Sequence, residues 1–178
     1  LVDCDKETWT LDIKKVLNAI NKKTKVILPV HIYGQAAKID ELKKIAKKYK
    51  IKIISDSAQS PYSFYKKKLA GTMADIGGYS LNCHKHINTG EGGIIVTNNK
   101  AYAKKMRLIR NHAEASISTK AKKKDLINML GYNFRMGEVE ASIGIEQMKK
   151  LKKIVKSRQI LANELNKMLR NLDNLLLP

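Results

Sequence analysis

An α/β fold with a mainly parallel sheet is predicted for this 178-residue chain from two observations. Strand-like apolar runs alternate with amphipathic helical patterns through the first hundred residues. This alternation is typical of a sheet whose strands are buried beneath helices. The composition, 43% hydrophobic and 29% charged, is that of a globular protein with a core of its own.

Each predicted element follows from a local pattern. Helical segments carry apolar residues three or four positions apart, whereas the strand segments are short apolar runs. Thr8 and Thr10 are the candidate caps of the first helix, and Asp40 and Glu41 suit the positive end of the second. Gly34 permits a sharp turn after the first strand. The expected order is helix 11–21, strand 25–30, helix 39–49, strands 51–56, 76–81 and 93–97, and helix 100–111.

The remainder of the chain is predicted to contain one long helix, from about residue 137 to about residue 169. That length predicts a bend or a bridging role between two domains. The preceding segment, which includes the basic stretch Lys120-Ala-Lys-Lys-Lys124, is expected to be an exposed connection. The strand-like opening Leu1-Val-Asp and the apolar ending Leu175-Leu-Leu-Pro178 suggest a fragment of a longer protein.

The positions of one lysine and one aspartate in the sequence suggest a cofactor-binding site. Asp56 ends the strand 51–56, and ligands of open α/β sheets bind beyond the carboxyl ends of strands. Lys85 lies in the run Ser80-Leu-Asn-Cys-His-Lys-His-Ile-Asn-Thr-Gly-Glu-Gly-Gly93. Pyridoxal phosphate requires an amine that forms an imine, a carboxylate for its ring nitrogen and a Ser/Thr/Gly cluster for its phosphate.

The order and spacing of these residues resemble the DegT/DnrJ/EryC1/StrS family of sugar aminotransferases, from about residue 1 to about residue 165. The resemblance implies a three-layer pyridoxal-phosphate (PLP) transferase fold, the aspartate aminotransferase-like fold type I, present as a fragment. Residues 1–136 would be part of the PLP-binding large domain. Residues 137–178 would be a long helix leading toward a mostly missing C-terminal small domain.

The same resemblance implies a role for each site residue. Lys85 would hold the cofactor and then, as a free amine, carry a proton between the substrate carbon and the cofactor. Asp56 would pair with the ring nitrogen, and Gln59 would lie near the phenolic oxygen. Ser80 would bind the phosphate, and Asn133 would reach the phosphate of the neighbouring subunit's cofactor. A homodimer with shared active sites would follow.

Each assignment has a simpler alternative. Asp56 could cap an Asp-Ser-Ala-Gln turn, and Ser80 could be one more small strand residue. Lys85 is one of 30 lysines, most of which are expected at the surface. The three glycines at 90, 92 and 93 alone signify a turn. Arg135 is expected to form a structural ion pair with Glu138 or Glu140 rather than to bind phosphate.

The histidines are assigned no chemistry. His31 and Tyr33 lie on the turn at the same sheet edge, and whether they line the pocket is left open. His84 and His86 would point to opposite faces of an extended segment, so no metal site is predicted. Cys4 and Cys83 are expected to be small buried side chains outside any disulfide.

The implied function is transfer of an amino group, with L-glutamate as donor, to a nucleotide-linked keto sugar. A PLP-dependent sugar dehydratase of the same family is the nearest alternative. In the sugar 3-dehydratases a histidine replaces the lysine, and this chain keeps Lys85. The identity of the keto sugar, its nucleotide and the choice between C3 and C4 amination are not determined by the sequence.

A basic nucleic-acid-binding module is the alternative from a different class, because the net charge is +19. However, only five of the 35 basic residues are arginine, and base reading favours arginine. The lysines are therefore predicted to form solvated helix faces, with no nucleic-acid partner. The chain has no apolar run of about 18 residues and opens without a signal-peptide pattern, which predicts no membrane span and a cytoplasmic location.

Overall fold

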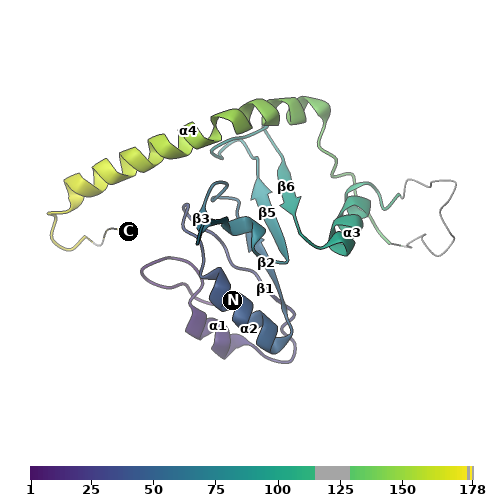
Figure 1. Cartoon of the computed structure of the whole chain (residues 1–178), viewed down its shortest axis with the longest axis horizontal. Helices are drawn as coiled ribbons and strands as arrows, with labels where there is room; N and C mark the ends of the chain where they lie inside the picture. Colours follow the sequence, from purple (N-terminus) through teal and green to yellow (C-terminus); the bar gives the residue numbers. More distant parts are fainter. Residues whose placement is uncertain (115–128, 176, 178) are drawn as a thin grey trace.

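The computed structural model describes residues 1–114, 129–175 and 177, so the basic stretch 120–124 lies outside the described residues. Within them the main sheet has the strand order β1-β2-β5-β6 (Figure 1). These strands are β1 (Val26–Ile27), β2 (Lys52–Asp56), β5 (Ile76–Ser80) and β6 (Gly93–Val96). β1, β2 and β5 run parallel and β6 runs antiparallel to β5. The mainly parallel sheet is as predicted.

The pairing of β2 with β5 brings their carboxyl ends to the same edge of the sheet. Asp56 stands beside Gly78 in the register, two residues before Ser80. The first strand is shorter than the predicted 25–30, and Val30 returns to the sheet only as a single bridge to Asp56. Pro29 explains the interruption, because proline has no N–H to donate to the ladder.

A small hairpin and a tight turn separate β2 from β5, and neither was expected. Strands β3 (Phe64–Tyr65) and β4 (Lys68–Leu69) pair antiparallel, and η1 (Ala70–Thr72) follows. The turn η1 packs so closely on β5 that a Cβ atom at Gly77 would lie 1.8 Å from the carbonyl oxygen of Gly71. Only glycine fits at that position of β5.

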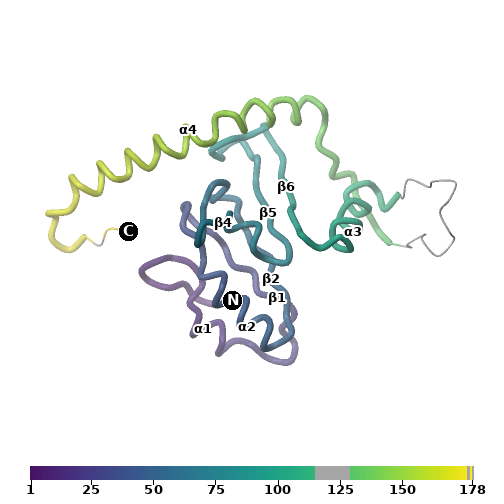
Figure 2. The backbone as a smooth tube through the Cα atoms, viewed as in Figure 1, coloured from purple at the N-terminus to yellow at the C-terminus, as the bar shows by residue number. Residues whose placement is uncertain are grey.

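Two helices follow the sheet in the chain. Helix α3 (Lys100–Arg110) begins at Asn99, whose side chain accepts hydrogen bonds from Ala101 N and Tyr102 N. Helix α4 (Glu138–Leu169) begins after Gly137, close to the predicted start, and passes across the end of the sheet where β5 ends and β6 begins (Figures 1 and 2). Its C-terminal half extends past the sheet. No helix in the described parts of the chain combines the length and apolar character needed to cross a membrane.

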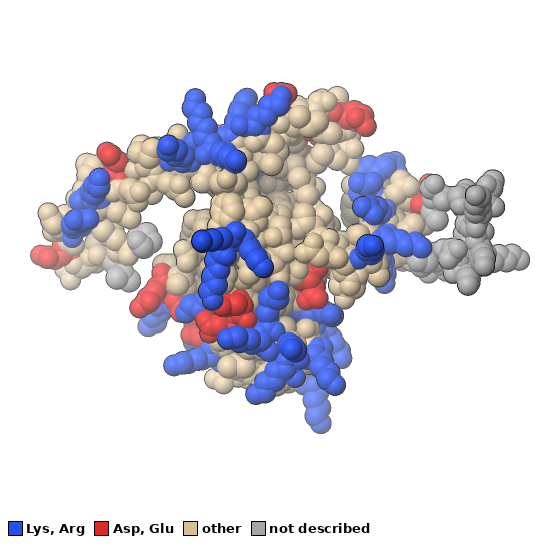
Figure 3. Space-filling model, viewed as in Figure 1, with Lys and Arg blue, Asp and Glu red and all other residues tan. Residues whose placement is uncertain are grey.

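The basic side chains are spread over several elements on the face shown in Figure 3, with acidic side chains among them. Five salt bridges in the described structure pair a lysine with a carboxylate, and each has an exposed lysine. Exposed pairs of this kind contribute about 0–1 kcal/mol each. The charge therefore affects solubility more than fold.

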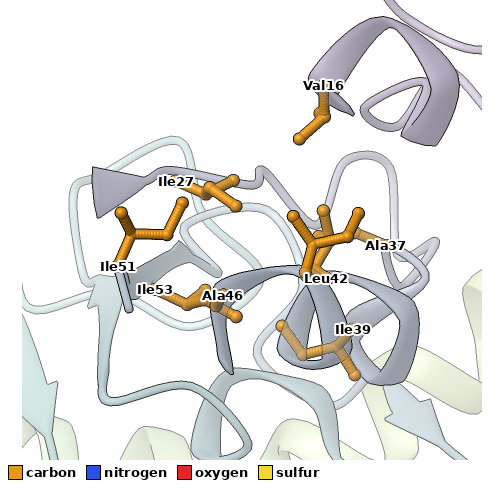
Figure 4. Close-up of a cluster of buried hydrophobic side chains, with 9 residues drawn as sticks. Val16, Ile27, Ala37, Ile39, Leu42, Ala46, Ile51 and Ile53 are labelled. Carbon is orange, nitrogen blue, oxygen red and sulfur yellow. The ribbon is translucent and has the colours of Figure 1, made fainter. Parts of the chain in front are cut away.

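The main core lies between the sheet and two helices, α1 (Ile13–Ala19) and α2 (Ile39–Tyr49) (Figure 4). Ile39 and Leu42 of α2 are fully buried, and Ile53 of β2 faces them. Helix α2 has the predicted bounds and ends at Lys50, which adopts the left-handed conformation. The core fixes the sheet from which the site loops emerge.

The predicted cap of α1 was wrong. Asp12, not Thr8 or Thr10, accepts hydrogen bonds from Lys14 N and Lys15 N. Leu11 is still extended, in an antiparallel bridge with Cys4, so the helix cannot begin at the threonines. Thr8 and Thr10 instead hydrogen-bond each other through their hydroxyl groups at 3.0 Å.

Candidate active site

An open cleft of about 1210 Å³ lies beyond the carboxyl ends of the parallel strands. Three loops and one face of α4 line it. Their contributions are Tyr33–Ala36 after β1, Gln59–Tyr65 after β2, His84–His86 after β5, and Val155, Arg158, Gln159 and Ala162 from α4, with Thr8, Lys38 and Glu41 at the margin. Its position agrees with the rule for ligand sites in open α/β sheets.

Lys85 is presented to the cleft by a loop that is anchored at both ends. Its backbone N–H donates to Asn82 O at 2.9 Å, which forms a turn. Thr89 N donates to Leu81 O, and Leu81 N donates to Gly92 O, so the loop closes on itself. The side chain of Lys85 is half-buried and lines the cleft. The backbone thereby fixes the base of the lysine side chain.

The glycines and Glu91 stabilise this loop. Gly90 has a φ of +82°, a conformation that residues with a Cβ rarely adopt. Asn82 donates from Nδ2 to Glu91 Oε1 at 2.8 Å, and Thr89 donates from Oγ1 to Glu91 O at 2.7 Å. The run from Thr89 to Gly93 therefore closes the lysine loop.

Asp56 is half-buried at the end of β2, at the same edge as Lys85. Its Oδ1 accepts a hydrogen bond from Ala58 N at 2.8 Å. One carboxylate oxygen of Asp56 therefore caps the turn that follows it, as the simpler alternative predicts. Oδ2 has no hydrogen bond to any residue that the structure describes. Asp56 is not among the residues that line the cleft surface.

Gln59 lines the cleft and is oriented by the neighbouring loop. Its Oε1 accepts a hydrogen bond from Tyr33 N at 3.4 Å, so its amide nitrogen remains a donor. Ser60 joins the same two loops, since its hydroxyl donates to His31 O at 2.6 Å and accepts from Gly34 N at 3.1 Å. Tyr33 lines the cleft, whereas His31 does not.

His31 is a fully buried support for these loops. Its Nδ1 accepts a hydrogen bond from Ala37 N at 3.0 Å, and its backbone N–H donates to Asp56 O at 2.8 Å. Burial lowers the pKa of His31 below its ordinary value, although the nearby Asp56 carboxylate acts in the opposite direction. We therefore expect a neutral imidazole at physiological pH.

His84 and His86 lie differently from the expectation. The segment forms a turn rather than an extended strand, so both histidines line the same cleft. The same turn leaves Cys83 exposed, and Cys4 is half-buried, so the expected burial of the two cysteines was wrong. Burial, followed by the positive charges of Arg158 and Lys85, lowers the pKa of His86. In the described parts of the chain, three or more His, Cys, Asp or Glu side chains do not gather in a group that could hold a metal ion.

Ser80 and Asn133 lie outside the cleft. Ser80 is half-buried at the end of β5, and its Oγ accepts from Asn82 N at 3.3 Å. Asn133 is exposed and pairs with Asn111 in an isolated bridge beside α3. Arg135 donates from Nη1 to Asn111 Oδ1 at 2.7 Å, so its structural partner is an asparagine and not the expected Glu138 or Glu140. Asn111 is the residue that ends α3.

Arg158 and Gln159 of α4 are cleft residues that sequence reasoning missed. The helical periodicity contained the signal. Leu151 is the only buried residue in the described part of α4, and residues 155, 158 and 162 follow it on the same face at helical spacing. Once Leu151 is known to pack on the lysine loop, the periodicity places Arg158 over the cleft.

The mainly parallel sheet, with the lysine loop at its carboxyl edge, has the architecture of the large domain of fold type I PLP transferases. The sequence pattern of the DegT/DnrJ/EryC1/StrS aminotransferase family matches residues 1–178, and the chain belongs to this family. The predicted family and fold class are confirmed.

Named relatives include enzymes that make amino sugars. The chain is 33% identical to the GDP-perosamine synthase of Caulobacter vibrioides, over 89% of this chain and 42% of that protein. PseC of Helicobacter pylori, an aminotransferase of pseudaminic acid biosynthesis, superimposes with a TM-score of 0.89 at 26% identity, over 97% of this chain and 46% of that chain. The chain thus spans less than half the length of these relatives.

A solved dehydratase is also similar. The GDP-4-keto-6-deoxy-D-mannose-3-dehydratase of Escherichia coli, with hydrated PLP bound, superimposes with a TM-score of 0.83 at 30% identity. The match covers 96% of this chain and 47% of that one. Aminotransferases and a dehydratase therefore share this fold, so the residues of the site must distinguish the two reactions.

Proposed function

We propose that the protein is a PLP-dependent aminotransferase that moves an amino group, with L-glutamate as donor, to a nucleotide-linked keto sugar. The single observation that carries the proposal is the placement of Lys85. Its loop holds it, half-buried, in a cleft at the sheet edge where Asp56 ends β2. The family match and the named relatives support the same activity.

The residues at this edge fit the chemistry of PLP. Asp56 has a free carboxylate oxygen for a protonated ring nitrogen, and the amide nitrogen of Gln59 is a donor for a phenolic oxygen. The Ser80 hydroxyl can donate to a phosphate, because its recorded hydrogen bond uses the oxygen as acceptor. The residues near this edge thus include a candidate partner for the ring nitrogen, the phenolic oxygen, the phosphate and the imine carbon, although Asp56 and Ser80 do not line the cleft surface.

When bound, PLP supplies an electron-withdrawing ring that stabilises the carbanion formed at the amine-bearing carbon. Lys85 would hold the cofactor and, as a free amine, would move a proton at its Nζ. Asp56 would pair with the ring nitrogen, and Gln59 would hold the ring through its phenolic oxygen. The loop joined by His31 and Ser60 keeps Gln59 in place.

A sugar dehydratase is the second candidate, because the E. coli dehydratase is similar in fold and sequence. Two histidines, His84 and His86, line the cleft beside Lys85. The lysine favours amino transfer, since the 3-dehydratases replace it with histidine. A nucleic-acid module is not favoured, because the basic residues are mostly lysines on several elements and not one arginine-rich surface.

The proposal includes the larger assembly. Residues 1–136 would belong to the PLP-binding large domain, and residues 137–178 would lead to a C-terminal small domain. Asn133 lies outside the cleft and is exposed, which supports a role toward a second subunit in a homodimer. We place the enzyme in the cytoplasm, with nucleotide-linked sugars and glutamate as small-molecule partners and no nucleic acid or membrane partner.

Amino transfer is tested with the full-length protein, PLP, L-glutamate and a panel of GDP-, UDP- and TDP-linked keto sugars. Mass spectrometry should detect an amino sugar and an equal amount of 2-oxoglutarate. Lys85→Ala should reduce the rate by a factor of about a thousand or more, because one residue is both nucleophile and proton carrier. Lys104→Ala, which removes an exposed lysine of α3, is the matched control and should leave the rate unchanged. Loss of water from the sugar without amine incorporation would favour the dehydratase instead.

A further inference from the structure

Helix α4 contributes a positively charged wall to the cleft. Leu151 is buried against Leu81 and Ile87 of the lysine loop, and Val155 packs against this cluster. Arg158 follows Leu151 by seven residues, about two helical turns, and therefore lies on the same face. Both Val155 and Arg158 line the cleft. The packing of Leu151 thus determines which side of α4 faces Lys85.

The positive charge of Arg158 is not neutralised within the described structure. Its guanidinium has no salt bridge or hydrogen bond to a residue that the structure describes. Two other charged residues stand at the margin of the cleft. The Nζ of Lys38 lies 3.6 Å from Oδ2 of Asp5, and Glu41 carries a negative charge. Arg158 also acts on the neighbouring histidine, since after burial its charge is the main cause that lowers the pKa of His86. The cleft beside Lys85 therefore has an excess of positive charge.

We propose that Arg158 binds an oxyanion of the substrate and so positions it for reaction at Lys85. The inference rests on the proposed function. Arginine presents a planar set of donors that matches a carboxylate or a phosphate with two parallel hydrogen bonds. Two parts of the substrates carry this chemistry, the diphosphate of the nucleotide-linked sugar and the carboxylate of the amino donor. Gln159, the next residue on the cleft wall, supplies a neutral donor beside it.

The test measures binding separately for the two sources of the anion. Full-length PLP-loaded protein is titrated by calorimetry with GDP, UDP and L-glutamate. Arg158→Gln should weaken one class of probe by about tenfold to a hundredfold, the range for loss of a hydrogen bond to a charged group. Arg158→Lys should restore part of the affinity, because it keeps the charge but not the planar donors. Arg170→Gln, an equal charge loss at the end of α4, should change binding less than twofold.

The outcomes are distinct. Weaker GDP or UDP binding assigns Arg158 to the diphosphate, and weaker glutamate binding assigns it to the donor carboxylate. Unchanged affinity for all three probes in Arg158→Gln, with an unchanged melting temperature, overturns the inference. Borohydride fixation of the cofactor to Lys85 is measured in the same samples, and its absence would instead refute the proposed function. The two failures therefore cannot be confused.

Discussion

The backbone around Lys85 determines where its amine can act. The turn from Asn82 and the closure of the loop between Leu81 and Gly92 hold the α-carbon at the sheet edge. The side chain of Gln59 is also held by the backbone, because the N–H of Tyr33 donates a hydrogen bond to its amide oxygen. Positioned groups of this kind reduce the entropy that must be lost before reaction. At the scale of single residues, the site depends on loop hydrogen bonds more than on charge pairs.

A prediction at this scale concerns His31. Burial lowers its folded-state pKa below the value of about 6.5 in the unfolded chain. Below pH 6.5 the unfolded chain binds the proton more readily, so the free energy of unfolding should fall as the pH falls toward the folded-state pKa. Above pH 6.5 this stability is fully present. Urea unfolding between pH 8 and pH 5 measures the slope.

A second histidine, His86, has a pKa shift of the same sign as that of His31 and provides a comparison. His31→Gln and His86→Gln should each flatten part of the slope below pH 6.5, because burial also lowers the pKa of His86. A wild-type slope in His31→Gln would contradict the account of a buried, neutral imidazole.

At the scale of elements, α4 joins the lysine loop through the buried Leu151, with Ile154 and Val155 packed beside it. Leu151 is 4% exposed and packs with Leu81 and Ile87. Leu151→Ala should reduce the free energy of unfolding by about 2–5 kcal/mol, the range for a buried leucine. It should also weaken PLP binding, because Ile87 is two residues from Lys85. Urea unfolding and cofactor titration measure the two effects.

The same helix provides the matched control. Leu161 lies on α4 and is 68% exposed, so Leu161→Ala should change stability by less than about 0.5 kcal/mol. Equal losses at positions 151 and 161 would mean that α4 is not held to the lysine loop by the buried leucine.

Elements whose apolar residues repeat at a regular spacing could be predicted from the sequence. Elements that depend on an unusual backbone conformation could not. Helix α2 has the predicted bounds because its buried residues repeat at helical spacing and Lys50 ends it. The β3–β4 hairpin was missed because its turn is Lys66-Lys67, with φ values of 46° and 67°, where glycine or asparagine is usual. Contacts to Asp40 of α2 from Tyr65 and Lys66 hold this turn.

At the scale of the whole molecule, the sheet edge could be predicted and the walls of the cleft could not. Asp56 and Lys85 follow parallel strands, so topology alone brings them to one edge. The helical period places Arg158 on the same face of α4 as Leu151, but the packing of that face on the lysine loop is a long-range contact that the sequence pattern alone does not give. The roles of Asp56, Gln59, Ser80 and Asn133 stay predictions.

The proposal of a homodimer with shared active sites leads to a prediction at this scale. Lys85→Ala and Asn133→Ala should each be inactive as homodimers, because each would spoil both sites. Unfolding and refolding of an equal mixture should restore about a quarter of wild-type activity, since half of the dimers would then contain one intact site. Activity measured against the mixing ratio tests this. No recovery would refute a shared site.

The central claim is that Lys85 is the residue that holds the cofactor. The most direct measurement is borohydride reduction of the full-length protein with PLP, followed by proteolysis and mass spectrometry of the labelled peptide. The account predicts one phosphopyridoxyl group, on the peptide that contains Lys85, and none in Lys85→Ala. A label on any other lysine, or the same label in Lys85→Ala, would contradict it.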